Sequence, residues 1–340
     1  MRIFLGGDLG GTKSHLLLAD EAGRVLGFAA GGGANHEAVG YGAVTEVVRS
    51  LFREVLASAG IGATRVTAAG FGIAGLDWGS EEPAQLAALR AAGVDGFPVT
   101  VVNDAVVGLL AGATEGWGIG LVSGTGCNCW GLDRDGRLGR VLGMGARVGE
   151  FAGASALVTR AVWAISRAAT RRGPETALTD AFLTAFRAAD ALAFLEGYCE
   201  ERYPVDASLA PLVFSVAEAG DRVATECIAW AGRELADLVT GVARQLDLTG
   251  SSFELVLIGS LFRGGPLLLD PLLAAVRAEA PGARTVTLSG PPVIGGVVLA
   301  MRRAGIDRRD IDRQRLAGSI QTDRSPVLAP RPHELEEVYS

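Results

Sequence analysis

The sequence predicts an α/β protein built from two related domains. A glycine-rich hairpin near the N-terminus returns once in mid-chain, and apolar strand-like runs alternate with amphipathic helix-like runs. The 340 residues are also enough for two hydrophobic cores. We expect the first domain at residues 1–116, the second at 117–292 with a helical insertion, and a charged tail at 305–340 that is either a mobile arm or a partner contact.

The first hairpin, residues 3–18, offers groups that suit a magnesium–nucleotide phosphate. Gly10 and Gly11 lack a Cβ, so the turn can bring backbone N–H groups against a ligand. Thr12 and Lys13 add a hydroxyl and a cation, and Asp8 at the strand end can hold a metal ion through water. An ordinary hairpin, with glycines for geometry alone, is the alternative.

A second hairpin repeats the first at a constant offset. A repeat of this length favours two similar domains over a short-period solenoid. If the two hairpins face each other, they would bind a polyphosphate between them, one on each side. The matched positions, each 113 residues apart, are Gly11–Thr12 with Gly124–Thr125, Asp20 with Asp133, and Gly23 with Gly136.

The elements around the hairpins alternate between strand and helix, which predicts a partly parallel sheet covered by helices. We expect the hinge between the domains at 116–118. The expected strands are 25–29, 66–73, 98–103, 253–258 and 285–288, and the expected helices are 44–56, 81–92, 105–111, 293–304 and several within 152–246, broken near 173–174 and 203–204.

Charge and composition argue against several classes of protein. The net charge of −7, without a basic block, argues against a nucleic-acid partner. The N-terminus has no signal-peptide pattern and charged residues or glycines interrupt the apolar runs, so we expect a cytoplasmic protein without a membrane span. The four cysteines indicate no disulfide framework. Cys127 and Cys129 share one face of a strand, as a metal pair or as two buried structural cysteines.

Four motifs in this order resemble the actin/hexokinase/Hsp70 ATPase superfamily: Asp8–Thr12, Val102–Asp104, Ser123–Gly126 and Leu257–Ser260. Within it, the chain is most similar to N-acetylglucosamine kinases and the related BadF/BadG-type ATPases, from about residue 3 to about residue 303. The resemblance implies a two-domain actin-like ATPase, a duplicated ribonuclease H-like fold with ATP and sugar in the interdomain cleft. It also implies that helix 293–304 returns to the first domain, and that the protein is a homodimer.

The resemblance assigns roles to these residues. It implies ATP and Mg2+ as cofactors, with Asp8 on the metal through water and Asp104 as the general base. Asp104 is equally explained as the N-cap of the helix at 105–111. The glycine motifs are likewise explained as ordinary turns. The residues implied to bind ATP and its phosphates are Asp8, Gly10, Gly11, Thr12, Lys13, Gly124, Thr125, Gly126, Gly259 and Ser260.

A second group is implied to bind the sugar. Asn35 offers donor and acceptor together, although a turn Asn in a glycine-rich loop is its ordinary role. Cys127 stands where relatives carry serine, Met144 where they carry an aromatic, and Glu150 is otherwise a first-turn helix acid. The implied sugar-binding residues are Asn35, Asp104, Cys127, Asn128, Gly143, Met144, Gly145 and Glu150.

The expected function is therefore an ATP-dependent kinase that phosphorylates an amino sugar, N-acetylglucosamine at O6. Glucose, glucosamine or N-acetylmuramic acid are alternative substrates. A BadF-type ATPase that activates a partner reductase or dehydratase is the alternative function, kept open by the Cys127/Cys129 pair, because such ATPases generally hold an iron–sulfur cluster. A nucleotide-binding regulator without catalysis is a third reading, against which the presence of Asp104 argues.

Overall fold

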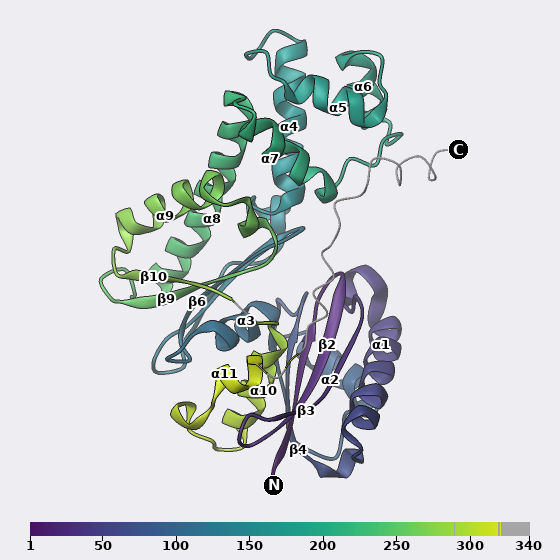
Figure 1. The fold of residues 1–340 in the computed structure, drawn as a ribbon, viewed down its shortest axis with the longest axis vertical. Coiled ribbons are helices and arrows are strands. Elements are labelled where there is room, and N and C mark those ends of the chain that lie inside the picture. Colours follow the sequence, from purple (N-terminus) through teal and green to yellow (C-terminus); the bar gives the residue numbers. More distant parts are fainter. Residues whose placement is uncertain (289, 319, 321–340) are drawn as a thin grey trace.

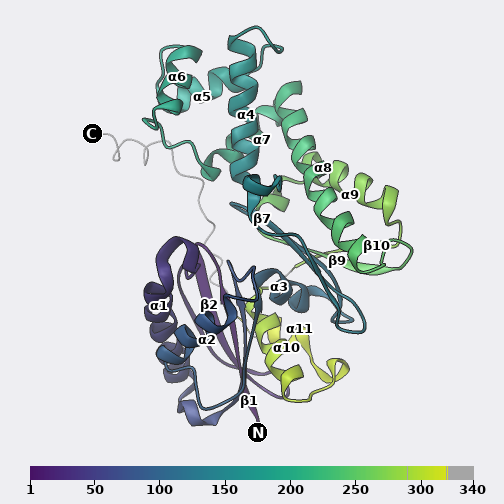
Figure 2. The same cartoon turned by 180° about the vertical axis from the view of Figure 1, so that it is seen from behind.

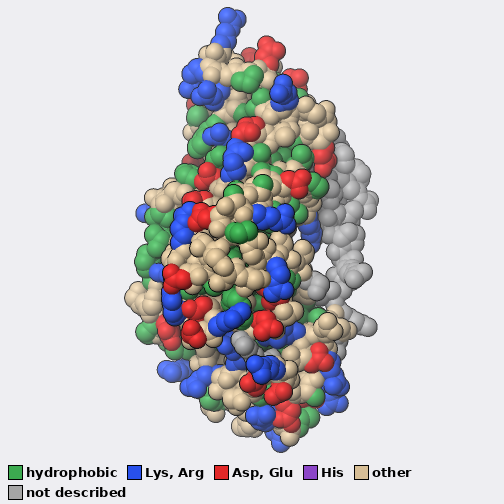
Figure 3. All heavy atoms as spheres, turned by 90° about the vertical axis from the view of Figure 1, so that its left-hand side faces the viewer, with side chains coloured by type: hydrophobic (Ala, Val, Ile, Leu, Met, Phe, Trp, Pro, Cys, Tyr) green, Lys and Arg blue, Asp and Glu red, His purple; other side chains and the backbone are tan. Residues whose placement is uncertain are grey.

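The computed structural model describes residues 1–288, 290–318 and 320. It contains two five-stranded sheets with helices packed on them, so the α/β prediction is confirmed. In Figure 1 the first sheet lies in the lower part of the molecule and the second crosses its middle, with helices above it. On the face shown in Figure 3, acidic and basic side chains of the described residues are interspersed.

The first sheet has the order β3-β2-β1-β4-β5. Its first three strands form an antiparallel meander, and β1, β4 and β5 run parallel. The parallel strands bring their carboxyl ends to one edge, where ligands of α/β proteins bind. The strands are β1 (Ile3–Leu9), β2 (Lys13–Asp20), β3 (Val25–Gly32), β4 (Val66–Ile73) and β5 (Val99–Asn103).

The second sheet has the order β8-β7-β6-β9-β10, which is the same topology strand for strand. Again the first three strands are antiparallel and β6, β9 and β10 run parallel. The duplication predicted from the repeated hairpin is therefore confirmed. The strands are β6 (Gly118–Ser123), β7 (Cys127–Leu132), β8 (Leu138–Arg140), β9 (Phe253–Ile258) and β10 (Ala283–Thr287).

The repeat extends to single hydrogen bonds at the far turn of each hairpin. The Oδ1 atom of Asp20 accepts the backbone N–H groups two and four residues later, at 3.0 and 2.9 Å. Asp133 does the same at 2.9 and 2.8 Å. Gly23 and Gly136 both have positive φ, 77° and 88°, which the turn requires. The repeated sequence thus encodes the same side-chain-capped turn twice.

Two helices pack between the sheets. Helix α3 (Asp104–Gly112) follows β5 and contacts β6, β7 and β9, whereas α10 (Val293–Arg303) returns to pack on β1 and β4. Figure 2 shows α3 and α10 between the two halves. A Cβ at Gly296 would lie 2.7 Å from the backbone of Gly7 and of Gly70, so this approach requires glycine.

Of the other helices, those at 36–59 and 82–91 pack on the first sheet and that at 222–245 packs on the second, while the rest pack mainly on other helices. Helix α1 begins at His36, earlier than the predicted Val44. Gly40, with φ 75°, is non-helical and kinks the helix between these two residues. The predicted helical insertion is confirmed, with α8 as its longest helix. These helices are α1 (His36–Ala59), α2 (Glu82–Ala91), α4 (Ala154–Ala169), α5 (Leu178–Phe186), α6 (Ala191–Cys199), α7 (Ala210–Glu218), α8 (Arg222–Gln245) and α9 (Pro266–Glu279).

The start of the tail is part of the core. Short helix α11 (Arg313–Gly318) follows α10, and Ile311, Leu316 and Ile320 are buried against the cluster that contains α10. The expectation of a mobile arm is therefore wrong for residues 306–318 and 320, and its remainder, 321–340, lies outside the described residues. No helix in the described part of the chain has both the length and the hydropathy to cross a bilayer.

Candidate active site

Two carboxylates predicted to act on ATP and substrate lie at the same edge of the first sheet. Asp8 stands near the carboxyl end of β1, and Asp104 directly follows β5. Strand β4 runs parallel between them, with Gly72 opposite Asp8 and Ile73 opposite Asn103. Burial, together with the charges of Asp8 and Asp77, raises the pKa of Asp104 to about 7. Asp104 therefore exchanges its proton near neutral pH.

The residue that caps α3 is Asn103. Its Oδ1 atom accepts the backbone N–H of Ala105 at 3.0 Å, in the usual N-cap geometry. Asp104 is the first residue of the helix, so the alternative in which Asp104 is the N-cap is wrong. The backbone N–H groups of Ala105 and Asp104 also interact with the Asp104 carboxyl and favour its charged form.

The first glycine turn is closed by its own backbone and supported by β3. The N–H of Gly10 donates to the carbonyl of Lys13 at 3.0 Å, and that of Ala34 donates to the carbonyl of Gly10 at 2.9 Å. A Cβ at Gly11 would meet nothing within 4 Å. Gly11, Thr12 and Lys13 are exposed, so the turn is open to a ligand.

The second glycine turn lies against the start of α4. The N–H of Ala154 donates to the carbonyl of Gly124 at 2.8 Å, and that of Ser155 to the carbonyl of Thr125 at 3.1 Å. A Cβ at Gly124 or at Gly126 would meet nothing within 4 Å. This turn is therefore also held from behind and open in front.

The predicted adenosine segment meets the second turn. Gly259 has φ 116°, and a Cβ there would lie 2.2 Å from the carbonyl oxygen of Ser123, at the end of β6. Only glycine allows β9 and β6 to end so close together. Ser260 is exposed beside this contact. The structure thus joins Gly259–Ser260 to the second turn.

Asn35 is the N-cap of α1. Its Oδ1 atom accepts the backbone N–H of Glu37 at 2.9 Å, so the amide already has a structural role. A Cβ at Gly75 would lie 2.6 Å from this oxygen, which places Asn35 beside the loop between β4 and α2.

That loop supplies a residue that the sequence reasoning missed, Asp77. Its Oδ1 atom accepts the side-chain N–H groups of Asn103 at 3.0 Å and of Asn128 at 3.1 Å. Burial raises the pKa of Asp77 to about 6, against the hydrogen bond from Asn128, which lowers it. Asp77 follows the carboxyl end of β4, which pairs with β5. Because ligands of α/β proteins bind beyond the carboxyl ends of parallel strands, this position could have indicated a site residue.

Several implied sugar-binding residues gather around Asp77. A Cβ at Gly143 would lie 2.8 Å from Oδ1 of Asp77 and 2.9 Å from Nδ2 of Asn128. The carboxylate of Glu150 accepts the backbone N–H groups of Leu142 at 2.6 Å and Met144 at 3.0 Å. Glu150 therefore holds this loop and precedes α4, so its reading as a first-turn helix acid is wrong. Gly145 begins the short helix η2 (Gly145–Val148).

The Cys127/Cys129 pair has the character of two structural cysteines. Burial raises the pKa of the Cys127 thiol to about 12, and it raises that of Cys129 well above its ordinary value. A metal ligand must be a thiolate, and burial opposes that form. Among the described residues, no group of three or more His, Cys, Asp or Glu side chains could hold a metal ion.

A separate cavity of about 700 Å³ lies between α4 and α8. Its walls contain arginines, including Arg160, Arg167 and Arg222, and none of the residues implied to bind ATP or sugar.

Comparison with known proteins agrees with this arrangement. The model of the BadF/BadG/BcrA/BcrD ATPase family matches residues 5–300. An N-acetyl-D-glucosamine kinase of Dictyostelium discoideum is 25% identical over 312 residues, covering 88% of this chain and 98% of that protein. An N-acetylmuramic acid/N-acetylglucosamine kinase of Clostridium acetobutylicum is 25% identical over 303 residues, with the same coverage.

Solved structures show the same fold. A protein of Chromobacterium violaceum, provisionally assigned as an N-acetylglucosamine kinase, has a TM-score of 0.67 and 27% identity, covering 88% of this chain and 99% of that one. A ROK-family glucokinase of Streptomyces griseus in complex with glucose and AMPPNP has a TM-score of 0.54 and 21% identity, covering 88% and 99%. The predicted two-domain actin-like ATPase fold is thereby confirmed.

Proposed function

Because the chain belongs to the BadF/BadG/BcrA/BcrD ATPase family, we propose that it is an ATP-dependent kinase of an amino sugar, transferring phosphate to O6 of N-acetylglucosamine. The observation that carries the proposal is the position of Asp104. It stands at the edge of the sheet beside Asp8, and burial brings its pKa to about 7. The kinase names of the two relatives, each matched over 98% of its length, support the same substrate class.

Asp104 would act as the general base. It would take the proton of the sugar hydroxyl as that oxygen bonds to the γ-phosphorus of ATP and the bond to the ADP oxygen breaks. The two open glycine turns would hold the phosphates with the backbone N–H groups of Gly11–Thr12 and Thr125–Gly126, because those of Gly10 and Gly124 already donate within their own turns. Asn35, Asn128 and the loop at 143–145 would hold the sugar.

Mg2+ fits the donor set at Asp8. This carboxylate is 13% exposed, and Nδ1 of His15 lies 3.7 Å from its Oδ2. Within residues 1–288, 290–318 and 320, no three His, Cys, Asp or Glu side chains are grouped to hold a metal, which suits Mg2+, because that ion usually keeps waters and binds substrate phosphates. Asp8 would hold it through water, and bound Mg2+ would neutralise charge on the phosphates.

A coupled ADP-release assay tests the proposal. Purified protein with Mg2+ and ATP is given N-acetylglucosamine, N-acetylmuramic acid, glucosamine or glucose in turn, and ATP alone measures hydrolysis. We expect the highest kcat/KM with N-acetylglucosamine and none with its 6-deoxy analogue, which lacks the accepting hydroxyl. Sugar-independent ATP hydrolysis in a coloured, iron-containing protein would favour a BadF-type ATPase instead. Light scattering tests the homodimer that the family resemblance implies.

A further inference from the structure

We propose that Asp77 is a positioning residue that keeps the two sides of the sugar site in register, one side from each half of the molecule. The proposal rests on the sugar-kinase function proposed above. Its basis is one oxygen atom: Oδ1 of Asp77 accepts from Asn103 of the first half at 3.0 Å and from Asn128 of the second half at 3.1 Å.

On the first side, Asp77 orients the residue before the proposed base. Asn103 is 2% exposed, and its Oδ1 atom caps α3 while its Nδ2 atom donates to Asp77. The amide is thus held at both ends, which fixes where the backbone enters α3 and therefore where Asp104 stands. A charged acceptor makes the bond to Nδ2 stronger than the one to the carbonyl of Leu76, which is 3.3 Å away.

On the second side, Asp77 orients a residue implied to bind the sugar. Asn128 lies on β7, and its Oδ1 atom accepts the backbone N–H of Cys129 at 2.8 Å. One of the two N–H groups of its amide donates to Asp77. Gly143 lies directly against this bond, where any larger residue would touch both partners.

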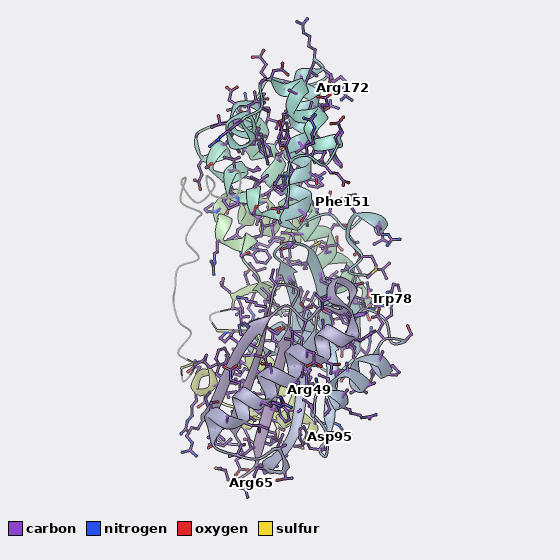
Figure 4. The ribbon with its side chains drawn as sticks, turned by 90° about the vertical axis from the view of Figure 1, so that its right-hand side faces the viewer. Arg49, Arg65, Trp78, Asp95, Phe151 and Arg172 are labelled. Atoms are coloured by element: carbon purple, nitrogen blue, oxygen red, sulfur yellow. The ribbon has the colours of Figure 1, made fainter. Side chains whose placement is uncertain are left out.

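A second contact joins the same loop to the second half. The guanidinium of Arg140, on β8, donates to the backbone carbonyl of Asp77. It lies 5.1 Å from the ring centroid of Trp78 and 5.2 Å from that of Trp130. Figure 4 shows Trp78 at the level where the two halves meet. Glu81 holds the loop from the other side by accepting the backbone N–H groups of Asp77 and Trp78, both at 2.9 Å.

A double-mutant cycle tests whether Asp77 works through Asn128. We would measure kcat and both KM values for Asp77→Ala, Asn128→Ala and the double variant with N-acetylglucosamine. Each single change should lower kcat/KM for the sugar by roughly 10- to 100-fold, and the double change should cost little more than one alone. Asp77→Asn, which keeps an oxygen acceptor, should recover most of the loss, and KM for ATP should stay near the wild-type value.

Small-angle scattering gives a readout independent of catalysis. Asp77→Ala and Arg140→Ala should each increase the radius of gyration of the sugar-free protein, because both remove bonds between the halves. The positioning role would be overturned if the losses of kcat/KM in the two single variants multiply in the double variant. It would also be overturned if Asp77→Ala keeps the wild-type kcat/KM. Wild-type protein that phosphorylates no sugar in the panel would instead overturn the proposed function, and scattering would still decide whether Asp77 joins the halves.

Discussion

The side chain of Asn103 accepts the backbone N–H of Ala105 at 3.0 Å, so the N-cap of α3 is Asn103, and Asp104 is the first residue inside the helix. Helix capping is therefore assigned to Asn103 and the proposed proton transfer to Asp104, and each residue can be mutated by itself. Asn103 supplies the cap and also orients the backbone at Asp104, whereas the proposed proton transfer belongs to Asp104 itself.

Asp104→Asn should abolish phosphotransfer while leaving the fold intact. A general base contributes typically ~10²–10⁴-fold to the rate, and ATP affinity should change little. Asn103→Ala is the comparison variant: it removes both the cap and the buried bond to Asp77, so it should lower the free energy of unfolding by ~1–3 kcal/mol and lower turnover less than Asp104→Asn does. Steady-state kinetics and urea unfolding of both variants make the comparison. Near-wild-type turnover of Asp104→Asn would exclude it as the base.

The raised pKa of Asp104 also predicts how stability depends on pH. The folded protein holds this proton up to about pH 7, whereas an ordinary aspartate loses it near pH 4. The carboxyl therefore favours the folded state at low pH, and that contribution is lost as pH rises through about 7. Asp104→Asn should consequently be more stable than wild type by ~1–3 kcal/mol at about pH 8, and the gain should shrink at about pH 5. An equal effect at both pH values would contradict the buried-carboxyl assignment.

Activity should follow the deprotonated form of the same carboxyl. The kcat/KM for the sugar should fall about tenfold for each pH unit below the pKa of Asp104, which is about 7, and level off above it. Melting temperatures measured across the range separate this effect from unfolding. A flat profile between about pH 5 and pH 8 would show that the base, if present, titrates elsewhere.

The two open glycine turns can be tested against the glycines that support them. Gly126→Ala adds a methyl group into open space, so the protein should fold normally and bind ATP more weakly. Gly153→Ala places its methyl 2.5 Å from the Cα of Gly126, so it should lower the free energy of unfolding by ~1–3 kcal/mol. Calorimetric titration with a non-hydrolysable ATP analogue and thermal unfolding distinguish the two. Unchanged ATP affinity in Gly126→Ala would remove this turn from the phosphate site.

Asn35 requires a variant that keeps its cap. Asn35→Asp retains the oxygen that accepts the N–H of Glu37 and removes the amide donor. It should keep the stability of α1 and raise the KM for the sugar, whereas Asn35→Ala should also lose ~0.5–2 kcal/mol of stability. The KM values for sugar and ATP report on the proposed sugar contact of Asn35, and the unfolding midpoints report on its role as the N-cap of α1. A sugar KM that rises only in Asn35→Ala would leave the cap as the whole role.

The duplicated hairpin was predictable because its signal is local: the Asp20 and Asp133 turns each lie within five consecutive residues. Asp77 was not, because its partners Asn103 and Asn128 are 26 and 51 positions away and no periodic pattern links them. The start of α1 was missed because Gly40 breaks the apolar repeat on which the helix prediction depended. The buried part of the tail was missed because Ile311, Leu316 and Ile320 are too few and too unevenly spaced to show a period.

The return of α10 to the first sheet has a consequence for synthesis of the chain. The strands of that sheet are synthesised well before the helix that covers β1 and β4, because this helix is formed by Val293–Arg303. At about 5–20 residues per second, that helix follows β5 by roughly 10–40 seconds. During this interval one apolar face of the nascent sheet lacks its partner, so the first half is a candidate for chaperone binding until residues 293–303 have been synthesised.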